Sequence, residues 1–349
     1  MTALELAESR SGPEMTGRID RLPVLLMFPH SRCNCRCVMC DIWRSRGRDE
    51  IAPEEVLEWL PELRRLGVEQ VALSGGEALL NTRLREICEM LHEAGIRITL
   101  ISTGILLPRH AGWIARLVED IVVSLDGPED IHNAIRGLPD AFTKLREGIR
   151  SIRTLRDDLP ITGRCVVQKA NHQHLRETVR AAREIGLDRI SFLAADVSSE
   201  AFNRPEGWGA ERAESVALSL GNLDALGAEI EAMERELRPE FASGFIAESP
   251  EKLRTRILRH YRALAGEDTF APVSCRAPWI SCVVEANGDV RPCFFHRRIG
   301  NVRESGGLEA VLNSPAATAF RRDLDVRTNP TCARCVCTLS APEHARRAS

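Results

Sequence analysis

The stretch SRCNCRCVMC at residues 31–40 contains four cysteines, and three of them, Cys33, Cys37 and Cys40, have the spacing C-x3-C-x2-C. Three thiolates so close together along one loop can hold three irons of a [4Fe–4S] cube and leave the fourth iron without a protein ligand. Most such cubes are held by four cysteines. The spacing therefore predicts a cube whose open iron binds something other than the protein.

Two alternative interpretations use the same segment. Zinc sites usually draw their ligands from two C-x2-C pairs, or from one such pair and two histidines. Only one C-x2-C pair lies here, and nothing comparable nearby completes a tetrahedral site. A single residue separates Cys35 from Cys33 and from Cys37. That tight spacing makes it the poorer cube ligand, so we interpret it as a loop residue.

The sequence around this segment alternates between strand and helix patterns. A hydrophobic run at residues 24–28 ends just before the cysteine loop and predicts a buried strand. Further strands are predicted at residues 68–73, 96–101, 121–125, 161–168 and 190–194, and helices at 53–66, 84–94, 110–118, 142–155 and 175–185. Such alternation predicts an α/β fold with a parallel sheet. About six units are fewer than the eight that close a TIM barrel, so we expect a partial (β/α)6 TIM-like barrel.

The carboxyl ends of these strands carry residues suited to ligands, which collect at such ends. The second strand ends in Ser74-Gly75-Gly76-Glu77, where glycines allow close backbone approach and the Glu77 carboxylate can balance an ammonium. The third ends in Ser102-Thr103-Gly104, whose hydroxyls can bond a ribose. The fourth ends in Ser124-Leu125-Asp126-Gly127. Taken alone, Gly-Gly-Glu is more often a plain strand-to-helix turn.

Together, these segments resemble the signature of the radical S-adenosylmethionine (SAM) superfamily over roughly residues 22–195. The resemblance implies that the open iron chelates the amino and carboxylate groups of SAM. It also implies a set of cofactor contacts: Met39 near the adenine, the Gly75-Gly76-Glu77 backbone at the SAM amino group, Ser102 and Ser124 as polar contacts, Asp126 toward SAM or substrate, and Arg164 toward the SAM carboxylate. A solvated strand-edge position is the alternative for Arg164, since most arginines stay exposed.

A second group of cysteines lies near the C-terminus. Cys275 and Cys293 flank Asn287-Gly288, a hairpin signal that predicts their proximity in space. Cys332 and Cys335 then form a C-x2-C pair, followed by Cys337. A C-x2-C pair together with two distant cysteines is also a four-thiolate pattern of structural zinc sites, and zinc remains an alternative here.

The order of these cysteines resembles the SPASM/Twitch auxiliary-cluster domain. The further cysteines that a SPASM domain supplies are missing, which favours the shorter Twitch variant with a second, auxiliary [4Fe–4S] cluster. The ligands implied are Cys275, Cys293, Cys332 and Cys335, with Cys337 as a possible replacement for Cys335. We interpret Cys88 and Cys165 as small buried hydrophobic residues and Cys282 as facing the inside of the hairpin.

The chain is expected to divide into four parts. Residues 1–21 are interpreted as a disordered lead-in, too short for the peptide-recognition domain of some relatives. Residues 22–195 form the radical SAM core, 196–270 a solvated helical bridge with helices at 210–237 and 251–264, and 271–349 the Twitch-like domain. Since the bridge should lie near the barrel mouth, we considered four of its residues as substrate contacts: Asp196, Asn203, Arg204 and Trp208.

The bulk properties agree with a metal-containing enzyme. The 349 residues carry a net charge of −3, which gives no reason to expect nucleic acid or a membrane surface as a partner. No signal peptide or long apolar run is apparent. Twelve cysteines in a chain of this size indicate metal and a reducing compartment, so we expect a cytoplasmic protein.

The resemblance implies a function. A reduced cube cleaves SAM to a 5′-deoxyadenosyl radical, which removes a hydrogen atom from the substrate. We expect a small polar metabolite of the sugar, aminocyclitol or nucleoside type, net oxidation through the auxiliary cluster, and an electron donor such as flavodoxin or ferredoxin. The alternatives are a peptide-modifying maturase and a redox-neutral decarboxylase or lyase. An electron carrier without catalysis would not need the Gly-Gly-Glu and Ser-Leu-Asp-Gly segments.

Overall fold

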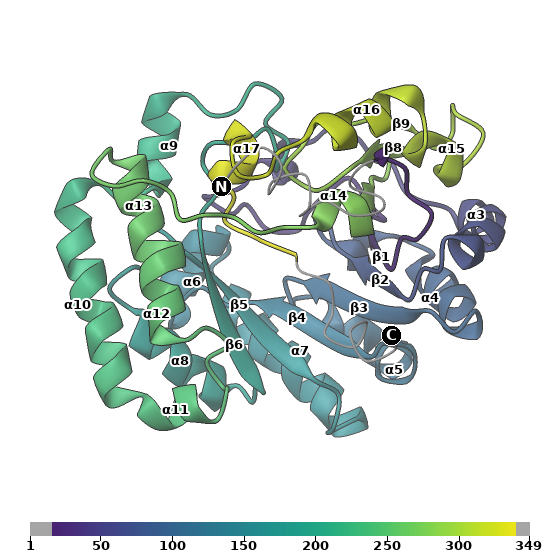
Figure 1. The fold of residues 1–349 in the computed structure, drawn as a ribbon. Helices are drawn as coiled ribbons and strands as arrows, with labels where there is room; N and C mark the ends of the chain where they lie inside the picture. Colours follow the sequence, from purple (N-terminus) through teal and green to yellow (C-terminus); the bar gives the residue numbers. More distant parts are fainter. Residues whose placement is uncertain (1–15, 340–349) are drawn as a thin grey trace.

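The computed structural model describes residues 16–339 and contains a nine-stranded sheet in the order β6-β5-β4-β3-β2-β1-β7-β8-β9 (Figure 1). Its first six strands are parallel and adjacent in chain order, as in an incomplete barrel. They are β1 (Val24–Met27), β2 (Gln70–Leu73), β3 (Arg97–Ser102), β4 (Asp120–Ser124), β5 (Ile161–Val167) and β6 (Arg189–Ala194). The predicted α/β fold with a partial parallel barrel is confirmed.

The crossovers contain the expected helices and one that the sequence analysis missed. The expected helices are α3 (Pro53–Arg65), α4 (Leu84–Glu93), α5 (Leu107–Leu117), α7 (Ala141–Leu155) and α8 (Leu175–Glu184). The additional helix, α6 (Glu129–Arg136), precedes α7 and ends at Gly137, which has a φ of +67°. A left-handed residue at this position is a common helix terminator. Short 3-10 turns follow the cysteine loop and β2, at η1 (Ile42–Arg44) and η2 (Ala78–Leu80).

The two faces of the parallel strands have different roles because successive side chains alternate between them. Leu25, Val71 and Leu100 are completely buried in the hydrophobic core. The alternate positions Leu26, Ala72 and others face an internal cavity. The barrel therefore has a packed outer layer and an open interior.

The predicted hairpin forms, and its first strand extends the barrel sheet. β7 (Ser281–Val284) pairs in parallel with β1, while β8 (Asp289–Arg291) and β9 (Gly300–Asn301) continue antiparallel. Gly288 in the turn has a φ of +86°, which favours glycine. The C-terminal cysteines are thus attached to the same sheet as the first cysteine loop. The remaining short helices are α14 (Ala277–Ile280), α15 (Leu308–Leu312), α16 (Pro315–Asp323) and α17 (Pro330–Ala333).

The segment expected as one helix at residues 210–237 is two helices, so that prediction was wrong. α9 (Ala210–Val216) is separated from α10 (Leu220–Glu236) by a break in which Ser219 and Asn222 form a capping box. Reciprocal capping at this position favours a new helix start. The helical run at 251–264 is confirmed, as α12 (Pro250–Leu253), a π-helical turn η3 (Arg254–Leu258) and α13 (Arg259–Leu264), and α11 (Arg238–Ala242) precedes it.

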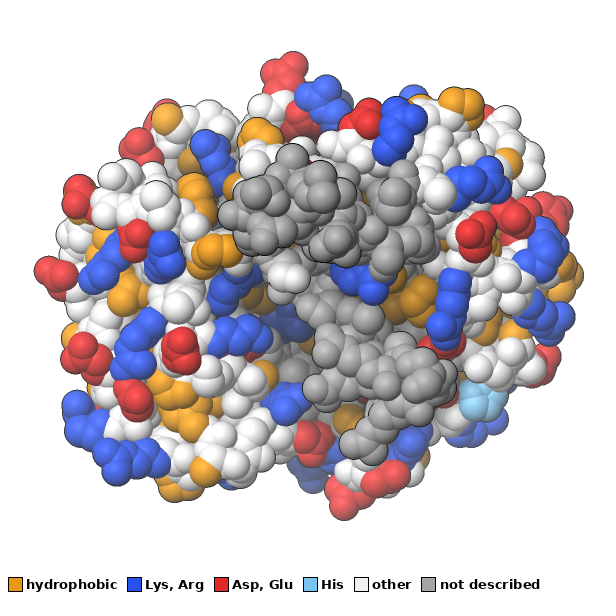
Figure 2. All heavy atoms as spheres, in the orientation of Figure 1, with side chains coloured by type: hydrophobic (Ala, Val, Ile, Leu, Met, Phe, Trp, Pro, Cys, Tyr) orange, Lys and Arg blue, Asp and Glu red, His pale blue; other side chains and the backbone are white. Residues whose placement is uncertain are grey.

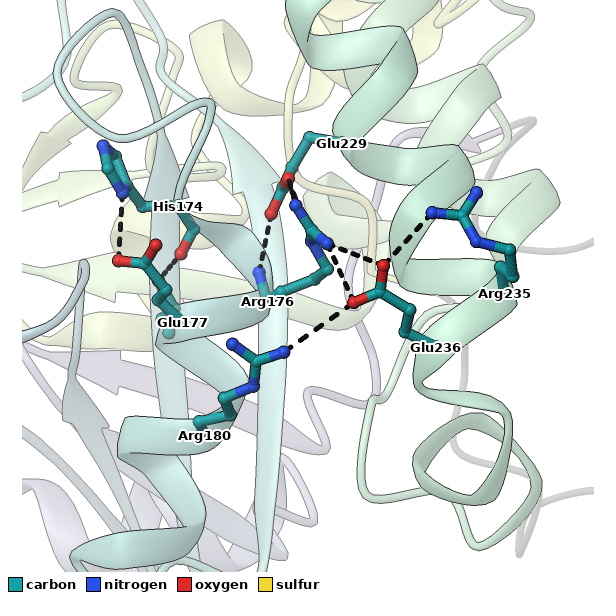
Figure 3. Close-up of polar contacts among 8 residues, drawn as sticks. His174, Arg176, Glu177, Arg180, Glu229, Arg235 and Glu236 are labelled. Atoms are coloured by element: carbon teal, nitrogen blue, oxygen red, sulfur yellow. Dashed lines mark hydrogen bonds and ion pairs between the residues drawn. The ribbon is translucent and has the colours of Figure 1, made fainter.

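Helix α10 packs firmly on the barrel through an apolar face and a network of charges. Leu226, Ile230 and Met233 are buried on its inner side. The Arg176 guanidinium of α8 donates to Glu229 at 3.1 and 3.0 Å and to Glu236 at 2.8 Å (Figure 3). Because the Glu229 side chain is buried, this part of the bridge is less solvated than expected.

The surface carries mixed charges. Acidic and basic side chains are interspersed over the face shown in Figure 2. Within residues 16–339, no helix is both long and apolar enough to cross a membrane. The predicted lead-in at residues 1–21 lies mostly outside the described residues, as does the end of the chain after residue 339.

Candidate active site

A cavity of about 220 Å³ lies at the carboxyl ends of the parallel strands, where the sequence analysis expected a ligand. It collects most of the predicted cofactor-site residues from five separate segments. Those that line it are Cys33, Cys37, Cys40, Met39, Gly75, Gly76, Ser102, Ser124 and Arg164. Glu77 and Asp126 do not line it, although both were predicted contacts.

The cysteine loop is held in place by backbone contacts with two motifs. Arg36 and Val38 donate from their backbone N–H groups to carbonyls of Arg136 and Ile135 at the end of α6, at 2.9 and 3.0 Å. On the other side, the backbone N–H of Glu77 donates to the Arg32 carbonyl at 2.9 Å. A Cβ at Gly76 would collide with the same carbonyl. Glycine is therefore required there for packing against the cysteine loop.

The Glu77 side chain has a different role from the one expected. It is completely buried and accepts hydrogen bonds from the Ser102 hydroxyl at 2.9 Å and the Thr103 hydroxyl at 2.7 Å. The backbone N–H groups of Thr103 and Leu79 also donate to it. Burial raises the pKa of this carboxyl. Since its oxygens are occupied by donors at the end of β3, Glu77 joins two strand ends and does not present its carboxylate to an ammonium.

Arg136 is a site residue that the sequence analysis did not single out. Its guanidinium donates to the Cys37 sulfur at 3.4 Å and lies 2.5 Å from the Asp126 carboxylate. Hydrogen bonding from Cys35 and the charge of Arg136 lower the pKa of Cys37, which favours the thiolate that binds iron. The only sequence signal was its place in Ile135-Arg136-Gly137, shortly after the fourth strand.

Asp126 acts through Arg136 and the sheet. Its carboxylate is completely buried and accepts a hydrogen bond from the Val166 backbone N–H at 3.0 Å. Together with the Arg136 contact, this ties β4, β5 and α6 to the cysteine loop. The predicted direct contact with SAM or substrate is therefore not what this geometry supports.

Arg164 occupies a central position in the barrel. It lines the cofactor-site cavity and the larger cavity below it, so it faces the interior, unlike the solvated strand-edge alternative. Its Nε is buried without a hydrogen-bond partner among the described residues. A free guanidinium beside the cysteine loop is suited to a carboxylate.

Three of the four bridge residues considered as substrate contacts pack around the end of the cysteine loop. The Arg204 guanidinium is buried, lies over the Trp208 ring at 3.9 Å and donates to the Met39 carbonyl at 3.1 Å. Trp208 and Asn203 donate to the side chain and backbone of Asp41, at 2.6 and 3.1 Å. Only Asp196, which pairs with Arg204 at 3.2 Å, also lines the cofactor-site cavity.

The second group of cysteines lines a cavity of about 380 Å³ in the barrel interior. These cysteines come from three segments and meet the inward side chains of β1 to β4; they are Cys275, Cys293, Cys332, Cys335 and Cys337. The Cys275 sulfur accepts from the backbone N–H groups of Ala277 and Leu339, at 3.4 and 3.5 Å. His296 places its Nε2 3.2 Å from the Cys332 sulfur, a contact that no sequence spacing indicated.

The donor sets at both places fit iron–sulfur clusters. Each consists of thiols with backbone or guanidinium donors near the sulfurs, and hydrogen bonds of this kind help to set the reduction potential of Fe–S clusters. Burial raises the pKa of Cys40 to about 12, of Cys293 to about 11 and of Cys332 to about 12, so a metal is needed to stabilise their thiolates. No group of three or more His, Cys, Asp or Glu within residues 16–339 is arranged to hold a single metal ion.

The other cysteines agree with their predicted structural roles. Cys88, Cys165 and Cys282 are completely buried in the core and line neither cavity. All twelve cysteines are free of disulfides. The thiols with access to a cavity are therefore those of the two proposed ligand groups, within the part of the chain that the structure describes.

Two protein-family models match the two regions of the chain that contain the cysteine groups. Residues 27–195 match the model of the radical SAM superfamily, and residues 275–336 match the SPASM model, described as an iron–sulfur cluster-binding domain. A PqqA peptide cyclase from Rhodopseudomonas palustris is 28% identical over 315 residues, covering 86% of this chain and 75% of the relative. An AdoMet-dependent heme synthase from Methanosarcina barkeri is 31% identical over 164 residues, covering 44% of this chain and 45% of that protein.

Solved structures share the fold. SuiB from Streptococcus suis, bound to the precursor peptide SuiA, has a TM-score of 0.64 at 15% identity and covers 93% of this chain and 73% of its own. The structure of native anSMEcpe with bound AdoMet has a TM-score of 0.64 at 19% identity and covers 87% of this chain and 83% of its own. Radical SAM domains bind a [4Fe–4S] cluster and SAM, and SPASM domains bind auxiliary iron–sulfur clusters. This chain thus belongs to the radical SAM superfamily and carries a C-terminal SPASM-type cluster-binding domain.

Proposed function

We propose that this protein is a peptide-modifying radical SAM enzyme that removes a hydrogen atom from a residue of its substrate. The observation that carries the proposal is the long alignment with PqqA peptide cyclases. Three of these relatives align over 83–86% of this chain and 73–75% of their own length. The matches to heme-pathway enzymes align over only 44–50% of this chain.

This proposal takes up the alternative from the sequence analysis in place of the small polar metabolite. That earlier expectation depended on the short N-terminal segment and on the Twitch-like cysteine count, and neither identifies a substrate. Three relatives that align over most of this chain are named as peptide cyclases, which supports a peptide substrate. Net oxidation and delivery of electrons by flavodoxin or ferredoxin remain part of the proposal.

In the proposed mechanism, Cys33, Cys37 and Cys40 would hold the first cluster, which would supply the electron for reductive cleavage of SAM. Gly75 and Gly76 border the same cavity, so their backbone is placed to contact the SAM amino group. Arg164 orients the SAM carboxylate through its unpartnered guanidinium.

The remaining lining excludes water from the reacting groups. Ser102 and Ser124 provide hydroxyls, and apolar side chains such as Met39, Val166 and Phe295 surround them. A water-poor interior protects a reactive radical from side reactions. The protein side chains thus orient SAM and exclude water from the reaction.

We assign the auxiliary cluster to Cys275, Cys293, Cys332 and Cys335, as a single Twitch-type cluster that would supply an electron acceptor. Ile101, Arg164 and Phe295 line both this cavity and the cofactor-site cavity, so the two interiors adjoin. Cys337 lines the cavity as well and remains the alternative to Cys335.

The test is anaerobic reconstitution followed by reduction in the presence of SAM. We expect release of 5′-deoxyadenosine, measured by liquid chromatography. Short peptides encoded beside the gene are then incubated with the enzyme, and a mass change in one of them supports the proposal. Absence of 5′-deoxyadenosine from fully loaded protein would refute the enzyme assignment. Conversion of a sugar or aminocyclitol, with every candidate peptide unchanged, would restore the small-metabolite expectation.

A further inference from the structure

A third cavity, of about 170 Å³, lies beside the proposed SAM site. It is bounded by β5 and β6, by the α12–η3 helical run and by residues 336–338. Arg164, Leu193 and Val336 line both this cavity and the cofactor-site cavity. A group bound in the third cavity would therefore lie next to the reacting part of the barrel.

The third cavity is lined by more positive than negative charge. Lys252 and Arg256 border it, with Arg164 at its boundary, and Glu248 is the one acidic side chain among the described residues that line it. Glu248 is held against β6, where it accepts from the Ser191 hydroxyl at 3.0 Å and from the Phe192 backbone N–H at 2.8 Å. Its carboxylate lies 3.9 Å from the Lys252 ammonium. One anion therefore faces three cations.

Arg256 is less compensated than Lys252, which has Glu248 beside it. Within the described residues, its guanidinium has no hydrogen bond to an acceptor and no ion pair. The neighbouring Arg254 instead forms an ion pair with Glu234 of α10. Of the two arginines in this π-helical turn, Arg254 is paired on the protein surface and Arg256 borders the third cavity. Figure 2 shows Lys and Arg side chains gathered near the middle of this face, beside α12.

The local helix geometry supports a binding role for Lys252 and Arg256. Residues four apart on a helix share a face, and both side chains line this cavity while neither borders the SAM cavity. π-helical turns occur frequently at functional sites. Arg164 is reserved for the SAM carboxylate in the mechanism above, so Lys252 and Arg256 remain available for a second anion.

We propose that Lys252 and Arg256 bind a carboxylate of the substrate and thereby anchor it beside the SAM site. The identity of the substrate as a peptide rests on the proposed function. Guanidinium groups bind carboxylates through two parallel hydrogen bonds, and the third cavity has room for one short acidic side chain or a chain terminus. The substrate is accordingly a peptide with an acidic residue or a free C-terminal carboxylate close to the modified position.

The test measures binding of small probes to reconstituted protein with SAM present and no reductant. The probes are N-acetyl-glutamate N-methylamide, its neutral glutamine counterpart, and N-acetyl-alanine, which has only a terminal carboxylate. We expect an anionic probe to bind about tenfold more tightly than the neutral one, by calorimetry or ligand-observed NMR, because hydrogen bonds from a cation to a carboxylate are stronger than those to a neutral amide. Preference for the glutamate or the alanine probe identifies the source of the carboxylate.

Variants connect the binding to these side chains. Arg256→Gln and Lys252→Gln should remove most of the discrimination between charged and neutral probes, and Arg256→Lys should keep part of it. Arg254→Gln is the matched control, since it removes a charge from the same turn without altering the cavity lining. Equal binding of all probes to the wild type, or discrimination that survives Arg256→Gln, would overturn the inference.

The outcome is independent of the test of function. A wild-type protein that releases 5′-deoxyadenosine but does not distinguish the probes would overturn this inference and leave the proposed function intact. A protein that distinguishes the probes through Arg256 but cleaves no SAM would support the anion site and refute the enzyme assignment.

Discussion

The two cysteine groups are built in opposite ways. Cys33, Cys37 and Cys40 lie in one loop of eight residues, whereas the auxiliary cysteines come from separate segments between residues 275 and 335 that the fold brings to one cavity. In the first group, spacing places the thiols together and the fold adds Arg136 beside them. In the second, the fold itself creates the site. A local site should therefore be less dependent on the rest of the domain than an assembled one.

The largest effect is expected from the local group. Replacing Cys33, Cys37 or Cys40 by alanine removes a thiolate that a methyl group cannot replace at iron, so SAM cleavage should be abolished. The measurement is 5′-deoxyadenosine release after anaerobic reduction. Cys35→Ala serves as the control and should retain cleavage. Loss of activity in Cys35→Ala together with a functional Cys37→Ala would reverse our choice of ligands.

Removing the assembled group should separate SAM cleavage from product formation. The wild type should contain about two cubes per chain, and the Cys332→Ala/Cys335→Ala variant about one. Some 5′-deoxyadenosine should still form, while product from the true substrate falls sharply. Iron analysis and Mössbauer spectra report the clusters. One cube with stoichiometric zinc in the wild type would contradict the auxiliary-cluster assignment.

A soluble Cys332→Ala/Cys335→Ala variant with normal product formation would show that the auxiliary site is outside the electron path. An insoluble variant would instead show that folding of the protein depends on the auxiliary metal site, because metal binding and folding are coupled in small metal domains. The Cys282→Ala variant, in which a buried thiol that lines neither cavity is removed, is the matched control.

Arg136→Gln tests how far the fold supports the local group. It leaves the Asp126 carboxylate buried without its cation, and breaking a buried pair costs about 3 kcal/mol or more. Denaturant unfolding measures this loss, and electron paramagnetic resonance reports any change at the first cluster. The double variant Asp126→Asn/Arg136→Gln should recover part of the stability. Additive losses would argue against direct coupling between the two residues.

The smallest effects are expected far from both groups, in the network of Figure 3. Glu229→Gln weakens a buried carboxylate's bonds to Arg176, at a cost of about 1–3 kcal/mol in unfolding free energy. Glu236→Gln changes a solvent-exposed partner of the same arginine, and its stability should be indistinguishable from the wild type. Equal losses of unfolding free energy in the two variants would mean that burial of the carboxylate does not determine how much each ion pair stabilises the protein.

Most of the barrel was predictable because its signals are local. Strand and helix periodicity located the six parallel strands, with boundaries within about two residues. The break between α9 and α10 was missed, since a continuous amphipathic pattern concealed the cap at Ser219. The pairing of β7 with β1 was also missed, because a hairpin signal describes only the turn and its two strands.

Sequence by itself determined the ligand chemistry: three cysteines in one loop, a glycine-rich strand end and a distant C-x2-C pair. Tertiary structure decided the direction of each side chain. Glu77 turns its carboxylate to Thr103, Arg136 reaches Cys37, and His296 reaches Cys332. Within one short segment, the spacing of residues along the chain determines which groups lie close together. Contacts between segments depend on packing and strand order, which no single segment encodes.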